Sequence, residues 1–360
     1  DAMANNFKMP QVLRSSLAVD HTVDGYKFTL EGIYTKTIND LKFQQVNLKD
    51  SVKYYTYDVL KQMPIYLSGG ATGQKLNTNF ANAYELSNTS EGHRYSLTAQ
   101  VSKTFTNGFT FMTAYTFGES FDLTNGIRNS MESNWQLNQS LTPNDPKIAY
   151  SNFDIRHRII GSFGYTKVYK NGSATTLSGV FSAQSGAPFT WGFVNSTIAN
   201  TPQAAGLAYV FKDETEAAKY LVDDAKLGSA ATQAKAFMDY INADEYLSTR
   251  KGNFTERNGG RTPWNATLDL KLNHLIKMSN GHDLQFSLDI MNATNLINSN
   301  WGRIYFSPNT FNSTASLGLS RVNSGTAADP TYKFAVPSAP YTVDQMGSRW
   351  QMQVGARYTF

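Results

Sequence analysis

The stretch SRWQMQVGARYTF, from Ser348 to Phe360, decides the fold class of this chain. From Trp350 on, its even positions carry apolar side chains and its odd positions carry polar or small ones. The apolar positions are Trp350, Met352, Val354, Ala356, Tyr358 and Phe360. A period of two residues indicates a β-strand whose two faces meet different surroundings, and a helix does not produce it.

The composition suits strands of this kind. Aromatic residues make up 13% of the 360 residues, and charged residues only 17%, below the roughly 25% that is usual in soluble domains. No run of about 18 apolar residues occurs, so the sequence excludes a transmembrane helix. Cysteine is absent, which removes disulfides, thiolate metal sites and thiol catalysis. The net charge of +4 is small and dispersed, so nucleic acid is a poor candidate partner.

The same alternation recurs along the chain and predicts an all-β fold with nine strands. One of the clearest begins at Trp264, where apolar residues up to Leu272 alternate with polar residues up to Asn273. Several strands are longer than the five or six residues usual in globular sheets. The expected strands cover 12–22, 26–36, 93–105, 109–119, 153–166, 174–189, 264–273, 284–290 and 350–360.

Short and long connections alternate between these strands. Tight turns containing Gly, with Asn or Asp, are expected at 24–25, 106–108, 170–172 and 279–281. Long loops cover 46–83, 120–151, 191–261 and 297–346. All tight turns therefore fall at one end of the sheet and all long loops at the other, which is the layout of a transmembrane β-barrel. The C-terminus is expected at the end with the tight turns, on the periplasmic side.

The long loop 191–261 contains the only helical pattern. Residues 213–227 begin with a variant of the capping box and end before Gly228, and residues 231–241 place apolar side chains on one face. We expect two short helices that lie over the barrel mouth and pack there, with a ligand lid as the alternative.

Several stretches resemble the TonB-dependent outer-membrane receptors, specifically the SusC-like and Oar-like branch. They are LEGIYTKTIND (30–40), SNFDIRHRIIGSFGY (151–165), LSGVFSAQSGAPFTW (177–191), ERNGGRTPWNATLDLKL (256–272) and the terminal VGARYTF. The resemblance implies a 22-stranded antiparallel barrel in a Gram-negative outer membrane, plugged by an N-terminal domain. Residues 1–360 would form the C-terminal portion of that barrel. Neither a plug domain nor a TonB box is recognisable in them.

The resemblance also implies a function and partners. The expected function is import of a bulky nutrient, a glycan, peptide or metal chelate, with energy passed from the inner membrane by TonB. The expected partners are membrane lipid and lipopolysaccharide, the barrel-assembly machinery, the remainder of the barrel with its plug, TonB through the missing N-terminal part, and a surface lipoprotein. The alternatives are a non-transporting barrel that acts as adhesin or scaffold through its loops, an outer-membrane enzyme, and a soluble β-sandwich, which usually mixes loop lengths at both ends.

Charged side chains on the predicted polar face are candidates for lining the lumen, because charges that face lipid are costly. Their expected role is to form salt bridges within the lumen and with the plug, and direct contact with substrate is the alternative. These residues are Glu31, Asp154, Arg156, Arg158, Asp269, Lys271, Asp289 and Arg357.

Aromatic residues at the strand ends are candidates for two further roles. Trp264 and Trp350 begin strands near the loop end and are expected in the aromatic girdle, with carbohydrate stacking as an alternative for either. For Tyr358 and Phe360 the resemblance implies an assembly signal that the barrel-assembly machinery recognises. Phe360 would also fit the aromatic girdle at the other interface.

No catalytic or metal-binding motif is apparent. The five histidines lack metal-ligand spacing, and the sequence contains neither a G-x-S-x-G elbow nor a P-loop. His157 follows Asp154 closely, but it falls on the lipid-facing positions of its expected strand, whereas a hydrolase would need it to point inward. We therefore expect a protein that moves its substrate without transforming it and that binds no metal or cofactor.

Overall fold

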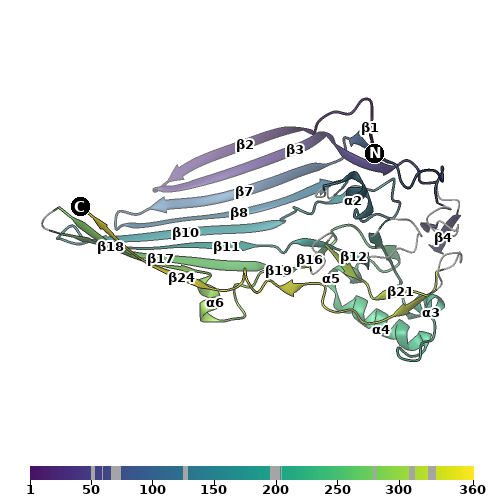
Figure 1. Ribbon diagram of the computed structural model, residues 1–360. Helices are drawn as coiled ribbons and strands as arrows, with labels where there is room; N and C mark the ends of the chain where they lie inside the picture. The colour runs from purple at the N-terminus through teal and green to yellow at the C-terminus, as the bar shows by residue number, and fades with distance from the viewer. Residues whose placement is uncertain are drawn as a thin grey trace.

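Nine long antiparallel strands lie side by side and form one curved sheet in the computed structural model (Figure 1). The structure describes residues 1–49, 53–58, 60–65, 74–124, 129–194, 203, 205–278, 281–307, 313–322 and 330–360. In order across the sheet, the long strands are β2 (Gln11–Val23), β3 (Tyr26–Gln45), β7 (His93–Thr104), β8 (Phe109–Asp122), β10 (His157–Val168), β11 (Ala174–Gln184), β17 (Asn265–Lys277), β18 (Asp283–Met291) and β24 (Gln351–Thr359). The nine strands predicted from alternation are all present.

The sheet does not close on itself. Within the described part of the chain, β2 pairs only with β3 and β24 pairs only with β18, so both outer strands have an unpaired edge. Three shorter strands complete the sheet near the loop end: β1 (Ala2–Met3), β6 (Tyr84–Thr89), which pairs with β3, and β9 (Ala149–Tyr150), which pairs with β8.

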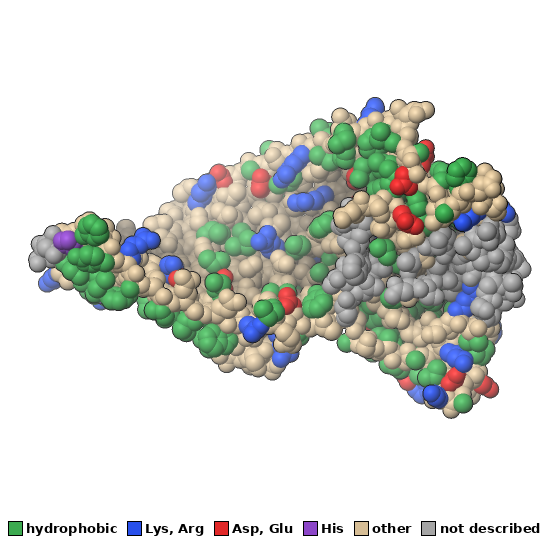
Figure 2. Space-filling view, in the orientation of Figure 1, with side chains coloured by type: hydrophobic (Ala, Val, Ile, Leu, Met, Phe, Trp, Pro, Cys, Tyr) green, Lys and Arg blue, Asp and Glu red, His purple; other side chains and the backbone are tan. Residues whose placement is uncertain are grey.

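The strand register separates an apolar face from a polar face. Leu177, Leu272, Leu288 and Val354 follow one another across β11, β17, β18 and β24, and therefore lie on the same face. One position along, the register joins Ser178, Lys271, Asp289 and Gln353 on the opposite face. Figure 2 looks into the hollow of the sheet, where Lys, Arg, Asp and Glu side chains are spread among polar ones.

The tight turns lie at one end of the sheet together with the C-terminus, and the long connections lie at the other end (Figure 1). Gly108, in one of these turns, has a φ of 86°, and a Cβ there would lie 2.4 Å from the carbonyl oxygen of Thr166. Only glycine fits this conformation and this close approach. Ser279 and Asn280, expected in the fourth turn, lie outside the described residues.

Three of the four long connections pack together at their end of the sheet and build a small domain. We call the described residues of 53–65, 188–261 and 313–334 the loop domain. Its core contains Tyr57, Phe189, Trp191, Phe211, Phe237, Ile241, Tyr332 and Phe334. Its strands are β4 (Lys53–Asp58), β5 (Lys61–Ile65), β12 (Pro188–Val194), β13 (Ala205–Leu207), β14 (Tyr209–Val210), β15 (Asn253–Phe254), β16 (Gly260–Arg261), β20 (Thr314–Ser316), β21 (Leu319–Arg321) and β22 (Tyr332–Phe334).

The loop domain contains three helices where the sequence predicted two: α3 (Glu214–Tyr220), α4 (Ala230–Ala243) and α5 (Glu245–Ser248). The side chain of Asp213 caps α3 by accepting a hydrogen bond from the N–H of Glu216 at 2.8 Å. The expected extension of this helix to 227 was wrong, because the N–H of Val222 donates to the carbonyl of Tyr332 instead. None of the described helices has the length and apolar character needed to span a membrane.

Strand β10 also begins later than predicted, at His157 instead of residue 153. The cause is Asp154, whose carboxylate accepts a hydrogen bond from the N–H of Ser120 at 2.7 Å and forms an ion pair with Arg261. These contacts hold residues 151–154 in a turn at the rim of the sheet, which the N–H of Asp154 closes by donating to the carbonyl of Ser151. The turn brings Asp154 and Arg156 to the loop end, next to the loop domain.

Candidate functional site at the loop end of the sheet

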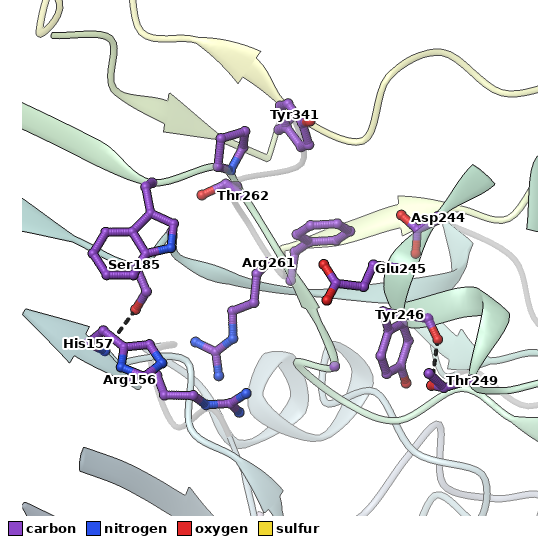
Figure 3. A pocket seen from close by; sticks show the side chains of 15 residues that line it. Arg156, His157, Ser185, Asp244, Glu245, Tyr246, Thr249, Arg261, Thr262 and Tyr341 are labelled. Carbon is purple, nitrogen blue, oxygen red and sulfur yellow. Dashed lines mark hydrogen bonds between the residues drawn. The ribbon is translucent and has the colours of Figure 1, made fainter. Parts of the chain in front are cut away.

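A cavity of about 620 Å³ lies where the rim of the sheet meets the loop domain. The chain supplies its walls from the start of β10, the segments around β12 and β16, the approach to β17, and helix α5 (Figure 3). Its volume falls within the roughly 300–1,000 Å³ of small-molecule sites in proteins. Three kinds of lining side chains determine its chemistry: two arginines, two carboxylates and a set of aromatic rings.

Arg156 and Arg261 form the wall on the side of the sheet. Arg261 forms an ion pair with Asp154, whose side chain is only 1% exposed, and donates to the carbonyl of the same residue at 2.9 Å. Arg156 approaches the carboxylate of Glu119, with Nε 3.4 Å from Oε1. Burial lowers the pKa of Arg261, although the nearby Asp154 carboxylate favours the charged guanidinium. Each arginine therefore has a carboxylate of its own behind the cavity wall.

Helix α5 forms the opposite wall. Asp244 caps the helix by accepting a hydrogen bond from the N–H of Leu247 at 2.8 Å, and Glu245 is the first helical residue. The hydroxyl of Tyr246 accepts a hydrogen bond from the N–H of Glu256 at 2.7 Å. Burial raises the pKa of Tyr246 to about 12, so this hydroxyl stays neutral at ordinary pH.

Two glycines allow this wall to approach the strands closely. A Cβ on Gly259 would lie 2.3 Å from the ring of Tyr246, and a Cβ on Gly260 would lie 2.7 Å from the ring of Phe189. Both distances are too short for a real side chain, so the two rings rest directly on backbone. The pair of glycines in the stretch ERNGGRTPW therefore shapes the cavity.

An aromatic stack forms the outer edge of the cavity. The indole of Trp264 stacks on the imidazole of His157, with ring centroids 5.7 Å apart and an angle of 16° between the planes. The hydroxyl of Tyr115 lies 2.8 Å from Nδ1 of His157, and the backbone N–H of His157 donates to the hydroxyl of Ser185 (Figure 3). His157 pairs with Phe117 on the apolar face, as its position predicted, yet it also lines the cavity.

The cavity offers charge, hydrogen bonds and aromatic surface. In the parts of the chain that the structure describes, no group of three or more His, Asp or Glu residues is placed to hold a metal ion. Asp244 and Glu245 supply two carboxylates from one wall, and the arginines of the other wall are engaged by acidic partners. This arrangement suits non-covalent binding of an organic molecule.

Six of the eight predicted lumen-lining residues lie on the polar face of the sheet. The register of the strands places Glu31, Arg158, Asp269, Lys271, Asp289 and Arg357 on this face. The ammonium of Lys271 lies 2.8 Å from the carboxylate of Asp289, directly across from it in the neighbouring strand. This is an ion pair within the polar face, and the role of that face in lining a lumen stays a prediction.

The other two predicted residues, Asp154 and Arg156, do not lie on a strand face. Both precede β10, and Asp154 is buried under Arg261 instead of facing an open lumen. For Asp154 the prediction failed because alternation was extended through a turn, in which the carboxylate of this residue bonds to Ser120 and Arg261. Arg156 still accepts a backbone hydrogen bond from Gly118 of β8 at 3.0 Å, and its side chain lines the cavity.

The predicted aromatic residues all lie on exposed surfaces. The side chains of Trp264 and Trp350 are about half exposed, and both lie at the loop end of the apolar face. Tyr358 stacks on His282, with its hydroxyl 2.9 Å from Nδ1, and Phe360 is almost fully exposed at the end with the tight turns. The roles proposed for these residues in the girdle and in assembly stay predictions.

Sequence reasoning missed three charged residues of the cavity: Arg261, Asp244 and Glu245. Arg261 follows the Gly259–Gly260 pair, and the two carboxylates follow the amphipathic helix α4 directly. Glu245 and Arg261 are 16 residues apart in the chain, and no periodicity links them. An adjacent pair of acidic residues after a helix was the only available signal, and by itself it indicates an exposed helix end.

Comparison with known proteins gives one match. The sequence model of a family described as "Outer membrane beta barrel domain" matches residues 1–330. No curated protein matches the chain.

Proposed function

The chain belongs to the outer membrane beta barrel domain family, and from this we propose that it forms the C-terminal wall of a TonB-dependent receptor of the SusC-like or Oar-like branch. Such a receptor imports a bulky nutrient across the outer membrane of a Gram-negative bacterium. The proposed role of the chain is to capture and pass on its substrate without chemical change, and without a metal or cofactor of its own.

The observation that carries this proposal is the two-faced register of the sheet. An apolar face built from residues such as Leu272 and Val354 suits lipid, and a face that holds the Lys271–Asp289 ion pair suits water. In a membrane, backbone groups at a strand edge need hydrogen-bond partners, so an open sheet edge is costly. The unpaired edges of β2 and β24 therefore support a larger barrel, in which further strands of the same protein pair with them.

The proposal gives the polar face of the sheet and the loop domain different roles. A 22-stranded barrel has a wide lumen, which needs a plug to keep the membrane sealed. Glu31, Arg158, Asp269 and Arg357 would contact the plug or the passing substrate. The loop domain, with its cavity, would capture the substrate at the cell surface.

The same proposal assigns the chain its partners at the two membrane interfaces, in assembly and in energy transfer. Trp264 and Trp350 would lie at the outer interface beside lipopolysaccharide, and the end with the tight turns would face the periplasm. Tyr358 and Phe360 would serve as the assembly signal for the barrel-assembly machinery. TonB would act through the plug, and a surface lipoprotein would cover the loop domain in the SusC-like arrangement.

Growth of the native bacterium tests the proposal. The gene would be deleted, and growth compared on glycans, peptides and metal chelates offered singly as limiting nutrients. Import predicts loss of growth on one nutrient class, restoration by the full-length gene, and the same loss in a strain without TonB. Unchanged growth on every class, together with loss of surface adhesion, would favour the adhesin or scaffold instead.

A further inference from the structure

The cavity carries an excess of negative charge on its open side. The positive charges of Arg156 and Arg261 are matched by Glu119 and Asp154, both of which approach the arginines from behind the wall. Asp244 and Glu245 have no such match: among the described residues, neither forms an ion pair with a Lys, Arg or His side chain. Figure 3 shows their carboxylates on the side of α5, away from the two guanidinium groups.

The fold fixes the start of helix α5, from which both carboxylates project. One oxygen of Asp244 is held by the N–H of Leu247, which keeps the side chain at the start of α5. The next residue, Glu245, has an exposed side chain that lines the cavity. Tyr246 is anchored through its hydroxyl on the N–H of Glu256 and through its ring on Gly259. These contacts of Asp244 and Tyr246 therefore hold the first turn of helix α5, and with it the backbone of both acidic residues, beside the cavity.

Aromatic rings complete the surroundings that a cation prefers. Trp264, Tyr246 and Tyr341 all line the cavity. The face of an aromatic ring attracts an organic cation, and the attraction grows when the cation is shielded from water. Two carboxylates and several rings around about 620 Å³ are complementary to a molecule that carries a positive charge on a larger polar or apolar framework.

We propose that this cavity binds an amine-bearing ligand, with the protonated amine held by the carboxylates of Asp244 and Glu245 and the framework packed on Trp264. The amine could belong to a peptide or to an amino sugar, because both offer the same ammonium group. This ligand class deepens the proposed function, and its role as imported cargo rests on that function. Binding at the cavity itself does not require transport.

The test measures binding to the full-length protein purified in detergent. The probes are a lysine-containing peptide and an oligomer of glucosamine, each compared with its N-acetylated form, which has the same framework without the charge. We expect one amine probe to bind at least about tenfold more tightly than its acetylated form, the worth of one charge-assisted hydrogen bond. The probe that shows this preference identifies the source of the amine.

The variant Glu245→Gln tests whether the preference for the amine probe arises in the cavity or at other acidic parts of the surface. It keeps the size of the side chain and removes its charge, so it should weaken the preferred amine probe by about tenfold and leave the acetylated probe unchanged. The matched control is Glu214→Gln, in the first turn of α3, which is exposed and does not line the cavity. This control should leave both affinities unchanged.

Two results would overturn the inference: equal binding of the amine and acetylated forms of both probes, or an amine preference that Glu245→Gln leaves intact. Neither result bears on import, which the growth experiment measures separately. Conversely, amine binding that depends on Glu245 in a protein without an import phenotype would support the cavity and contradict the transport proposal.

Discussion

The hydroxyl groups of Tyr57 and Tyr332 lie 2.8 Å apart at the centre of the loop domain, although 275 residues separate them in the chain. Both side chains are almost completely buried, and burial is the main cause that raises the pKa of each phenol. The contact joins the first long connection of the sheet to the last one. It makes these two connections parts of one folded unit instead of separate loops.

Removing one of these hydroxyls should loosen the loop domain. Tyr332→Phe keeps the ring but takes away the partner of a buried hydroxyl, at a cost of about 1–3 kcal/mol in local stability. This loss of local stability would be measured as a faster rate of proteolytic cleavage within the loop domain. In a double-mutant cycle, the substitution Tyr57→Phe should reduce stability much less in the Tyr332→Phe variant than in the wild-type protein. Strictly additive effects would mean that the two hydroxyls do not interact.

An arginine placed on either face of β11 should show which face meets lipid. Phe181 and Val180 are adjacent, yet they point to opposite faces, and Val180 lies across from Asp269. Phe181→Arg should destabilise the folded barrel by up to about 2–4 kcal/mol, depending on its depth in the bilayer. Val180→Arg gains an acidic neighbour and should cost little. The fraction folded in lipid vesicles at increasing urea would measure both, and equal costs would contradict the assignment of the faces.

The buried ion pair at the rim should be sensitive to loss of one partner. Arg261→Met leaves the Asp154 carboxylate buried without a cation, which typically costs about 3–5 kcal/mol. Adding Asp154→Asn removes the stranded charge and should recover part of that loss. The control is Lys147→Met, because the Lys147–Asp145 pair is exposed and worth about 0–1 kcal/mol. The denaturant midpoints of the purified single variant Arg261→Met, of its double variant with Asp154→Asn, and of the control would give the three changes in stability.

Gly186 should not tolerate a side chain. A Cβ there would lie 1.7 Å from the carbonyl oxygen of Thr262, so Gly186→Ala must push apart the chain that leaves β11 and the chain that enters β17. Overpacking of this kind costs about 1–3 kcal/mol or more. Gly32→Ala is the matched control in β3, because a Cβ at Gly32 meets no atom within 4 Å. The temperature at which each folded barrel unfolds would distinguish them, and equal temperatures would contradict the close approach.

Acid should remove one stabilising contact of the loop domain. Asp224 accepts hydrogen bonds from Lys333 and from the backbone N–H groups of Lys226 and Leu227, which lower its pKa to about 2. Because this pKa lies below the unfolded value of roughly 4, the contribution is complete above about pH 4 and is lost as the pH falls towards 2. The difference in unfolding temperature between wild type and Asp224→Asn should therefore be constant from pH 6 to 4 and shrink below that. A difference that grows on acidification would have the wrong sign.

The sequence by itself determined the two faces of the sheet and the positions of its strands. Alternation is a local property, since neighbouring side chains of a strand point to opposite sides wherever the strand is placed. For the same reason, the polar face could be assigned for Lys271 and Asp289 without any structure. The failure at Asp154 has a cause that is not local: its carboxylate is held by Ser120 and Arg261, which lie 34 and 107 residues away in the chain, and the sequence does not reveal these partners.

Only the tertiary structure decided that three of the four long connections share one core and that a cavity lies beneath it. Arg261 meets Asp154 across 107 residues, and Tyr57 meets Tyr332 across an even longer stretch. Neither contact leaves a periodic signal, because each depends on how separate loops pack and not on the repeat of one element. The acidic wall of α5 and the aromatic edge at Trp264 therefore become one site only when the chain is folded.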